Sequence, residues 1–191
     1  MNQMSPDKQR LASSIAMTIL LISFSMLFAV LFLGYAVFRV QNESWPPMGM
    51  PHVPLIYPLS STLLILASSF TYWRFQRLFF EKASLSLLKL WLGITLFFGL
   101  AFVGSQWVLW ESMWEQGLYV SAGIFPSLIH GFTWVHVAHM ALAMFALIFL
   151  YWKIRGTDYG VSDETKVVNI GKFWHFLDIV WLAMFGALFV I

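Results

Sequence analysis

The stretch Gly171–Ile191, GKFWHFLDIVWLAMFGALFVI, sets the architecture expected for the whole chain. From Phe173 onward nearly every side chain is apolar, and about 20 residues at 1.5 Å each are enough to cross the hydrocarbon core of a bilayer. The stretch nevertheless contains Asp178. A carboxylate inside a membrane helix costs about 2.5–3.5 kcal/mol near the centre, so we expect Asp178 to face protein rather than lipid.

Polar groups surround this carboxylate at helical spacing. His175 lies three residues before Asp178, and Trp181 lies three residues after it. Side chains at this spacing share one face of a helix, so an imidazole, a carboxyl group and an indole N–H can line up there, with Trp174 beside them. The simplest interpretation is that His175 and Asp178 satisfy each other and lock a helix-packing contact. A proton-handling or ligand-binding role is the alternative.

The composition is typical of a membrane protein. The 191 residues are 60% hydrophobic and only 10% charged, whereas soluble domains carry about a quarter charged residues. Cysteine is absent, which excludes disulfides, thiolate metal ligands and thiol catalysis. We expect no cleavable signal peptide, because the apolar run after Arg10 is too long for a signal-peptide core.

Charged residues and prolines divide the sequence into five apolar runs. We therefore predict an all-α integral membrane bundle of five transmembrane helices, forming a single domain over residues 1–191. The segment 41–58, which holds five prolines, is expected to be an interfacial loop between the first two helices. The segment 153–171 is expected to be a loop before the last helix. The predicted helices cover residues 14–38, 54–73, 88–110, 127–152 and 172–191.

The distribution of Lys and Arg predicts the orientation. Ten of the eleven Lys and Arg residues fall in the N-terminal segment and in the second and fourth connectors, whereas the opposite side carries only Arg39. Because cytoplasmic loops are enriched in Lys and Arg, we expect a cytoplasmic N-terminus. After five crossings the C-terminus would lie outside, on the periplasmic side.

Histidines in the apolar runs are the remaining candidates for chemistry. His130, His136 and His139 lie in the fourth run and His175 in the fifth. His136 and His139 share a helix face, so a haem or metal site has to be considered. The expected depths differ, however, because His136 should lie toward the outer side and His175 near the inner end. We therefore expect packed, hydrogen-bonded histidines, with no catalytic, metal or nucleic-acid site.

Five stretches, taken in order, resemble subunit III of haem-copper cytochrome c oxidases. The set covers almost the whole chain, and its last member is the most specific. The count of five helices resembles the shorter bacterial form of that subunit, which lacks the first two helices of the seven-helix form. The stretches are WPPMGMP at 45–51, SSTLLILASS at 60–69, LGITLFFGLAFVGSQ at 92–106, GFTWVHV at 131–137 and FWHFLDIVW at 173–181.

The resemblance implies a non-catalytic accessory subunit of a terminal oxidase in the bacterial inner membrane. Such a subunit binds no haem or copper, which belong to partner subunits, and it flanks the catalytic subunit I in a complex that also contains subunit II. It stabilises subunit I, supports proton uptake there and holds phospholipid between its helices. The positions that match the family pattern are Trp45, Pro46, Thr62, Gln106, Gly131, His136, Trp174, His175, Asp178 and Trp181.

Three positions depart from the family pattern. Phe24 and Leu109 stand where the family carries acids, and Thr133 replaces a histidine. These departures indicate a divergent branch and leave an alternative open, a subunit-III-like accessory protein of a nitric oxide reductase. A haem-binding membrane redox protein that uses the membrane histidines is a third hypothesis.

Overall fold

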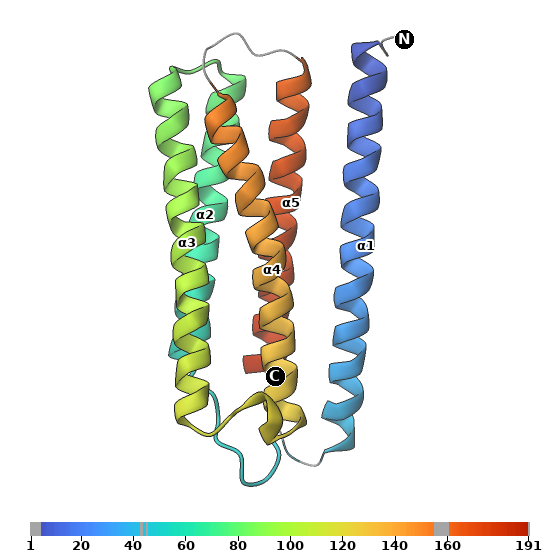
Figure 1. The fold of residues 1–191 in the computed structure, drawn as a ribbon, viewed down its shortest axis with the longest axis vertical. Helices are drawn as coiled ribbons and strands as arrows, with labels where there is room; N and C mark the ends of the chain where they lie inside the picture. The colour runs from blue at the N-terminus through green and yellow to red at the C-terminus, as the bar shows by residue number, and fades with distance from the viewer. Residues whose placement is uncertain (1–4, 43, 45, 155–160, 191) are drawn as a thin grey trace.

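The computed structural model describes residues 5–42, 44, 46–154 and 161–190, and helices dominate this part of the chain (Figure 1). The described residues contain five long α-helices and no strand, which confirms the predicted all-α class. The helices are α1 (Pro6–Gln41), α2 (Ile56–Phe80), α3 (Leu85–Glu115), α4 (Ile124–Lys153) and α5 (Val161–Phe185), with a short 3-10 turn η1 (Val120–Ala122) before α4 and a π-helical segment η2 (Gly186–Val190) after α5.

Four of these helices, α1, α3, α4 and α5, are long and apolar enough to cross a membrane. α2 has 25 residues, which at 1.5 Å per residue make about 37 Å. It does not belong to the four, because Ser, Thr and Tyr side chains interrupt its apolar residues. The crossing of the membrane by α2 therefore stays a prediction.

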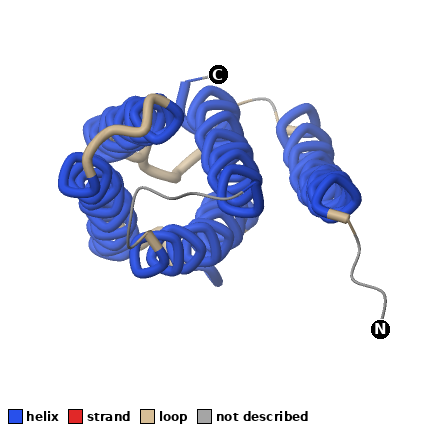
Figure 2. The backbone as a smooth tube through the Cα atoms, turned by 90° about the horizontal axis from the view of Figure 1, so that it is seen from above, coloured by secondary structure: helices blue, strands red, loops and turns tan. Residues whose placement is uncertain are grey.

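The helices form a ring of four with one helix beside it. Figure 2, which looks along the helices, shows α2, α3, α4 and α5 around a common core and α1 to one side. α2 packs along α3 and against α5, while α4 lies between α3 and α5. α1 contacts α5 and, less extensively, α4. The N-terminal end of α1 and the C-terminal end of α5 lie at opposite ends of the bundle (Figure 1).

The helices extend past the predicted spans, most clearly in the fifth. We predicted a loop before residue 172, but α5 begins at Val161. Charged residues mark the end of an apolar run rather than the end of a helix, and the acids Asp163 and Glu164 in the first turn of α5 favour a helix N-terminus. His175 consequently lies about 18 Å along the helix from Asp163 and about 22 Å from Val190. Residues 161–171 of the predicted loop are therefore helical, while the depth of His175 in the membrane stays a prediction.

Aromatic rings attach α1 to the rest of the bundle. Phe24 makes an edge contact with the ring of His139, with centroids 4.3 Å apart. One and two turns further along, Phe28 packs against the same imidazole and Phe32 packs against Phe132. These contacts use only one side of α1, and its opposite side remains exposed along its whole length.

Polar contacts fasten α1 near both ends. Near its N-terminal end, Ser13 Oγ accepts a hydrogen bond of 3.1 Å from Asn169 Nδ2. Near its other end, Tyr35 donates a hydrogen bond of 2.5 Å to the carbonyl oxygen of Ala187. Ala187 lies in the π-helical η2, where the usual i→i−4 hydrogen bonds of an α-helix are not made. The π-helical segment thus offers a carbonyl group to another helix.

Tyr35→Phe should loosen this outer contact without unfolding the chain. One lost hydrogen bond costs about 1 kcal/mol, so we expect a small fall in the free energy of unfolding. Amide hydrogen exchange should become faster in η2 and in the last turns of α1. Tyr119→Phe is the control, because Tyr119 is 54% exposed. Equal exchange rates in both variants would contradict the role assigned to Tyr35.

Candidate functional site

Indole groups of α5 donate hydrogen bonds to hydroxyl groups of α2. Trp181 Nε1 lies 3.0 Å from Thr62 Oγ1, and Trp174 Nε1 lies 3.3 Å from Ser68 Oγ. Both tryptophans are fully buried. The structure therefore points these two predicted residues at α2 and not at Asp178.

Toward the start of α5 the direction of donation reverses. The hydroxyl of the fully buried Tyr72 donates a hydrogen bond of 2.8 Å to the carbonyl oxygen of Val167. Tyr72 also lies over Gly171, where a Cβ atom would be only 2.7 Å from its Cε1 atom. Together with the indole bonds, this contact joins α2 to α5 along most of their shared length.

His175 and Asp178 lie between the indole bonds. His175 Nδ1 is 2.7 Å from Ser69 Oγ and 3.4 Å from Asp178 Oδ2. The serine of α2 is therefore the closer partner of the imidazole. Asp178 is 4% exposed, and its other oxygen, Oδ1, is buried without a hydrogen-bond partner among the described residues. The His175 side chain is 34% exposed, so the cluster reaches the outside of the bundle.

A second polar group joins α2 to α3. Gln106 Nε2 donates a hydrogen bond of 2.9 Å to Ser61 Oγ, which is also 2.7 Å from Ser105 Oγ. Thr95 donates to Thr71 over 2.9 Å. Gln106 is fully buried, and its Oε1 atom has no partner in the described part of the chain. The hydroxyl groups that lower the hydropathy of α2 are thus used in contacts with its two neighbours.

His136 lies inside an aromatic box. The rings of Phe28, Phe102 and Trp181 surround it, with centroids 6.3, 5.7 and 5.5 Å away. The residue is fully buried, and neither ring nitrogen has a hydrogen-bond partner within the described ranges. We predicted a structural polar seam formed by His136, Trp174, His175, Asp178 and Trp181. Of these five, His136 is the one joined to the others by ring packing alone, through Trp181.

Replacing the imidazole of His136 tests whether its ring nitrogens contribute to the free energy of unfolding. We expect His136→Phe to leave the free energy of unfolding unchanged or to raise it by about 1–3 kcal/mol, because it removes polar atoms that are buried without partners. His130→Phe is the matched control on α4, since His130 is equally buried but its Nδ1 is 2.9 Å from the carbonyl oxygen of Pro126. Thermal unfolding of both variants in detergent micelles makes the comparison. A larger loss for His136→Phe would contradict the unpartnered state.

The three departures from the family pattern are filled by packed or hydrogen-bonded side chains. Phe24 packs against His139, as described above, and Leu109 is fully buried in an apolar cluster at one end of the bundle. Thr133 Oγ1 accepts a hydrogen bond of 2.9 Å from Trp110 Nε1 and so joins α3 to α4. Each position is therefore part of the packing between helices.

The remaining predicted positions lie outside the seam. Trp45 is outside the described residues, Pro46 is half-buried in the connector between α1 and α2, and Gly131 has open space where a side chain would be. For the histidine hypothesis, no three His, Asp or Glu side chains among residues 5–42, 44, 46–154 and 161–190 come close enough to share a metal ion.

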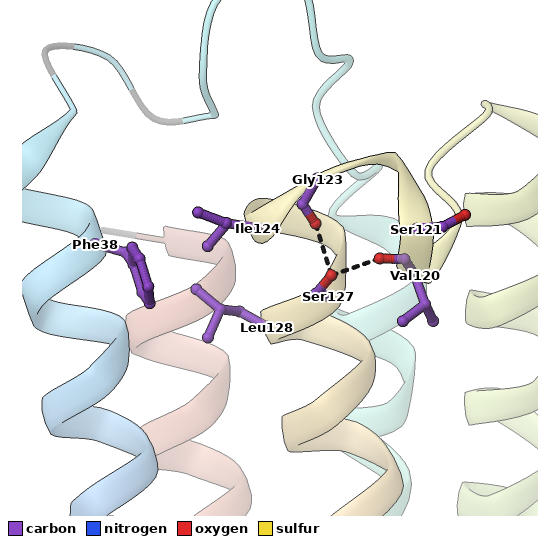
Figure 3. A pocket seen from close by; sticks show the side chains of 7 residues that line it. All are labelled: Phe38, Val120, Ser121, Gly123, Ile124, Ser127 and Leu128. Atoms are coloured by element: carbon purple, nitrogen blue, oxygen red, sulfur yellow. Dashed lines mark hydrogen bonds between the residues drawn. The ribbon is translucent and has the colours of Figure 1, made fainter.

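Two pockets open along the side of α4 that faces α1. The larger, of about 460 Å³, lies at the end of the bundle where α4 begins, and Figure 3 shows Phe38 of α1 opposite Ile124 and Leu128. Ser127 lines this pocket, and its hydroxyl group donates to the carbonyl oxygens of Val120 and Gly123 (Figure 3). The second, of about 410 Å³, is lined only by the apolar side chains of Met26, Leu27, Val30, Leu31 and Val135.

The similarity to known proteins extends over nearly the whole helical bundle. A family model described as cytochrome c oxidase subunit III matches residues 9–191. The chain belongs to the cytochrome c oxidase subunit III family. The resemblance predicted from the five sequence stretches is thereby confirmed, and the chain is a membrane protein.

Bacterial relatives agree with membership of the subunit III family. The chain is 27% identical over 178 residues to a cytochrome c oxidase subunit 3 of Thermostichus vulcanus, covering 93% of this chain and 86% of the relative. It is 30% identical to a probable cytochrome c oxidase subunit 3 of Nocardia farcinica, covering 93% and 87%. It is 29% identical to a cytochrome bo(3) ubiquinol oxidase subunit 3 of Pseudomonas aeruginosa, covering 86% and 78%.

The sequence did not predict that α5 is the helix that packs on α2. The matched stretch 60–69 contains Thr62, Ser68 and Ser69, which hold α5, but Tyr72 lies outside it. A signal was present, because Thr62, Ser69 and Gln76 are spaced by seven residues and so lie on one stripe of a helix. A polar stripe in a membrane helix marks a contact with protein rather than with lipid.

Proposed function

We propose that this chain is the non-catalytic subunit III of a haem-copper terminal oxidase in aerobic respiration. The family match over residues 9–191 carries the proposal. The relatives named above support it, since they include subunits of both a cytochrome c oxidase and a ubiquinol oxidase. The chain would lie beside the catalytic subunit I, in a complex with subunit II, and haem and copper would be held by these partners.

The proposed place is the bacterial inner membrane, with α2 as the fifth crossing helix and the N-terminus in the cytoplasm. Support comes from the end of the bundle where α2 ends and α3 begins. Arg77 is paired with Glu81 over 2.9 Å and also lies over the ring of Trp73, while Lys89 lies over the ring of Tyr151. Such basic and aromatic pairs suit a membrane boundary on the cytoplasmic side.

The proposed role is stabilisation of subunit I and support of its proton uptake by structural means. Side chains at the positions of the missing family acids pack between helices, and buried hydroxyl groups join α2 to both of its neighbours. A bundle fastened in this way offers a rigid surface to a partner. We do not assign a carboxylate proton path to positions 24 and 109, since Phe24 and Leu109 carry no ionisable group.

Phospholipid is the proposed ligand of the two pockets beside α4. The inner lining of the second pocket is fully apolar, as acyl chains require, and the first pocket lies at the end of the bundle, where a headgroup region would be. A lipid there would fill the space that α1 leaves along α4. Lipid mass spectrometry of the purified complex tests this part of the proposal.

Purification of the native complex tests the main proposal. With an affinity tag on this chain, mild detergent extraction should recover a haem-copper subunit I, and a reduced-minus-oxidised spectrum should show its haem bands. Recovery of a nitric oxide reductase subunit instead would favour the alternative function. A chain that purifies alone, or that binds haem itself, would overturn the proposal.

A further inference from the structure

The turn that joins α2 to α3 carries an excess of positive charge. Four basic residues and one acid fall within residues 74–89. We call this set the basic turn: Arg74, Arg77, Glu81, Lys82 and Lys89. The opposite end of α3 has the reverse sign, because its last two turns hold Glu111 and Glu115 and no Lys or Arg. Positive charge is therefore concentrated at one end of the α2–α3 pair.

Aromatic rings hold two cations of the basic turn in place. The guanidinium group of Arg77 lies 6.0 Å from the ring centroid of Trp73, and the ammonium group of Lys89 lies 5.8 Å from that of Tyr151. Tryptophan and tyrosine rings of membrane helices are enriched at the level of the lipid headgroups. Long basic side chains lay their stems along apolar surface there and keep the charge in the polar layer. These contacts fix both cations at headgroup depth.

Lys82 adopts a backbone conformation that normally belongs to glycine. Its φ angle is 54°, and no other non-glycine residue of the described ranges has a positive φ. The N–H groups of Lys82 and Ala83 close the end of α2 by donating to the carbonyl oxygens of Phe79 and Leu78, each over 3.1 Å. Glycine is the usual residue at this position, because a Cβ atom is unfavourable there. A lysine held in a strained conformation points to a task for its side chain.

The chemistry of the basic turn suits a ligand with negative charge. Glu81 Oε1 lies 2.9 Å from Arg77 Nε and balances one cation, which leaves three other cations without a carboxylate inside the basic turn. Phosphate oxygens form strong charge-assisted hydrogen bonds with ammonium and guanidinium groups. Each Lys or Arg at a membrane surface also strengthens the attraction to anionic lipid. A zwitterionic headgroup brings its own cation and gains less from this charge.

Apolar surface for the acyl chains lies directly beside these cations. Trp73 and Phe80, on the last two turns of α2, are 48% and 49% exposed. A phospholipid whose phosphate lies at Lys82 can cover both rings with the upper part of its acyl chains. The basic turn thus combines the charge and the apolar surface that one anionic phospholipid requires.

We infer that the basic turn binds an anionic phospholipid of the cytoplasmic leaflet and selects it over a zwitterionic one. The site differs from the two pockets beside α4, which are lined by α1, α4 and the segment 120–123. The inference rests on the proposed function in one respect, because it requires this end of the bundle to lie in the cytoplasm. The preference for one lipid over another does not depend on the complex.

The test compares phosphatidylglycerol with phosphatidylcholine of the same acyl chains. Each lipid is titrated into micelles of the full chain, and bound lipid is counted by native mass spectrometry. We expect phosphatidylglycerol to bind at least about fivefold more tightly. Lys82→Gly should weaken its binding by about fivefold, the effect of one lysine, and leave phosphatidylcholine binding unchanged. The same variant should have a higher melting temperature, because glycine relieves the strain.

Three further variants separate the site from the net charge of the chain. Glu81→Gln removes the acid of the basic turn and should strengthen phosphatidylglycerol binding. Lys82→Arg keeps the charge and should keep the affinity within about twofold. Lys8→Gln is the matched control, because Lys8 is an exposed residue of α1 at the same end of the bundle (Figure 1). Its loss changes the net charge as much as Lys82→Gly does but should not change the affinity.

Three results would overturn the inference: equal affinity for the two lipids, equal losses in Lys82→Gly and Lys8→Gln, or a carbodiimide cross-link between Lys82 and another subunit in the native complex. The last result would show that protein covers the basic turn. Co-purification with subunit I is measured on the same preparations. If the chain co-purifies but does not select phosphatidylglycerol, only the inference fails. If it selects phosphatidylglycerol but purifies alone, only the proposed function fails.

Discussion

Trp174→Ala should lower the free energy of unfolding of the full chain by about 3–5 kcal/mol, the usual cost of removing a buried aromatic ring. Trp174 is completely buried between α2, α3 and α5. Its indole N–H is bonded to Ser68, and its Cη2 atom lies 2.9 Å from the position that a Cβ atom on Gly99 would take. The measurement is denaturant titration in mixed micelles. Trp107→Ala is the control, since Trp107 is 61% exposed.

The close approach to Gly99 allows a sharper test by a double-mutant cycle. Alone, Gly99→Val should cost about 1–3 kcal/mol through overpacking against the ring. In the Trp174→Ala background the added methyl groups occupy vacated space, so the cost should shrink or reverse. Coupling energies between contacting residues reach about 0.5–3 kcal/mol. Strict additivity of the two substitutions would show that the ring and the glycine do not meet.

Gly171→Val is expected to push α2 away from α5 where Tyr72 lies over Gly171. A Cβ atom there would be 2.7 Å from Tyr72 Cε1 and 3.3 Å from Gln76 Oε1. Tyr72 is fully buried and held by its bond to Val167, so it has little freedom to move. We expect a loss of about 1–3 kcal/mol, the usual range for overpacking. Thermal unfolding of the full chain in detergent measures it.

Gly104→Val is the matched control for both glycine substitutions. Gly104 is also inside a membrane helix, but no atom lies within 4 Å of its added Cβ. Valine has a higher helix propensity than glycine, by a few tenths of a kcal/mol, so this variant should be unchanged or slightly more stable. Equal losses at Gly104 and Gly171 would mean that the helix backbone, and not the contact with Tyr72, sets the cost.

Hydropathy and charge predicted the class of the fold well, because they describe each helix against its solvent. The long apolar helices α1, α3 and α4 follow directly from uncharged runs. The same reasoning failed for the start of α5, where the helix continues through charged residues. A hydropathy reading detects the boundary of the hydrocarbon and not the end of the helix.

Contacts between helices were harder to predict than helices. The spacing of His175 and Asp178 showed that they share a face, but the nearest partner of the imidazole is Ser69, 106 positions earlier in the chain. Likewise Trp174, Trp181 and Thr62 were identified, while the pairing of the two indole groups with Thr62 and Ser68 of α2 was not. Pairings of this kind depend on which helices become neighbours, and a single sequence carries that information only indirectly, through features such as the polar stripe of α2.

The position of α1 has a consequence for biosynthesis. Its polar fastenings, Tyr35 with Ala187 and Ser13 with Asn169, join residues 152 and 156 positions apart. At about 5–20 residues per second, a ribosome needs about 8–30 s to make the chain between them. α1 can therefore pack on α4 before α5 is synthesised, but its two polar fastenings cannot form until α5 and η2 have been made.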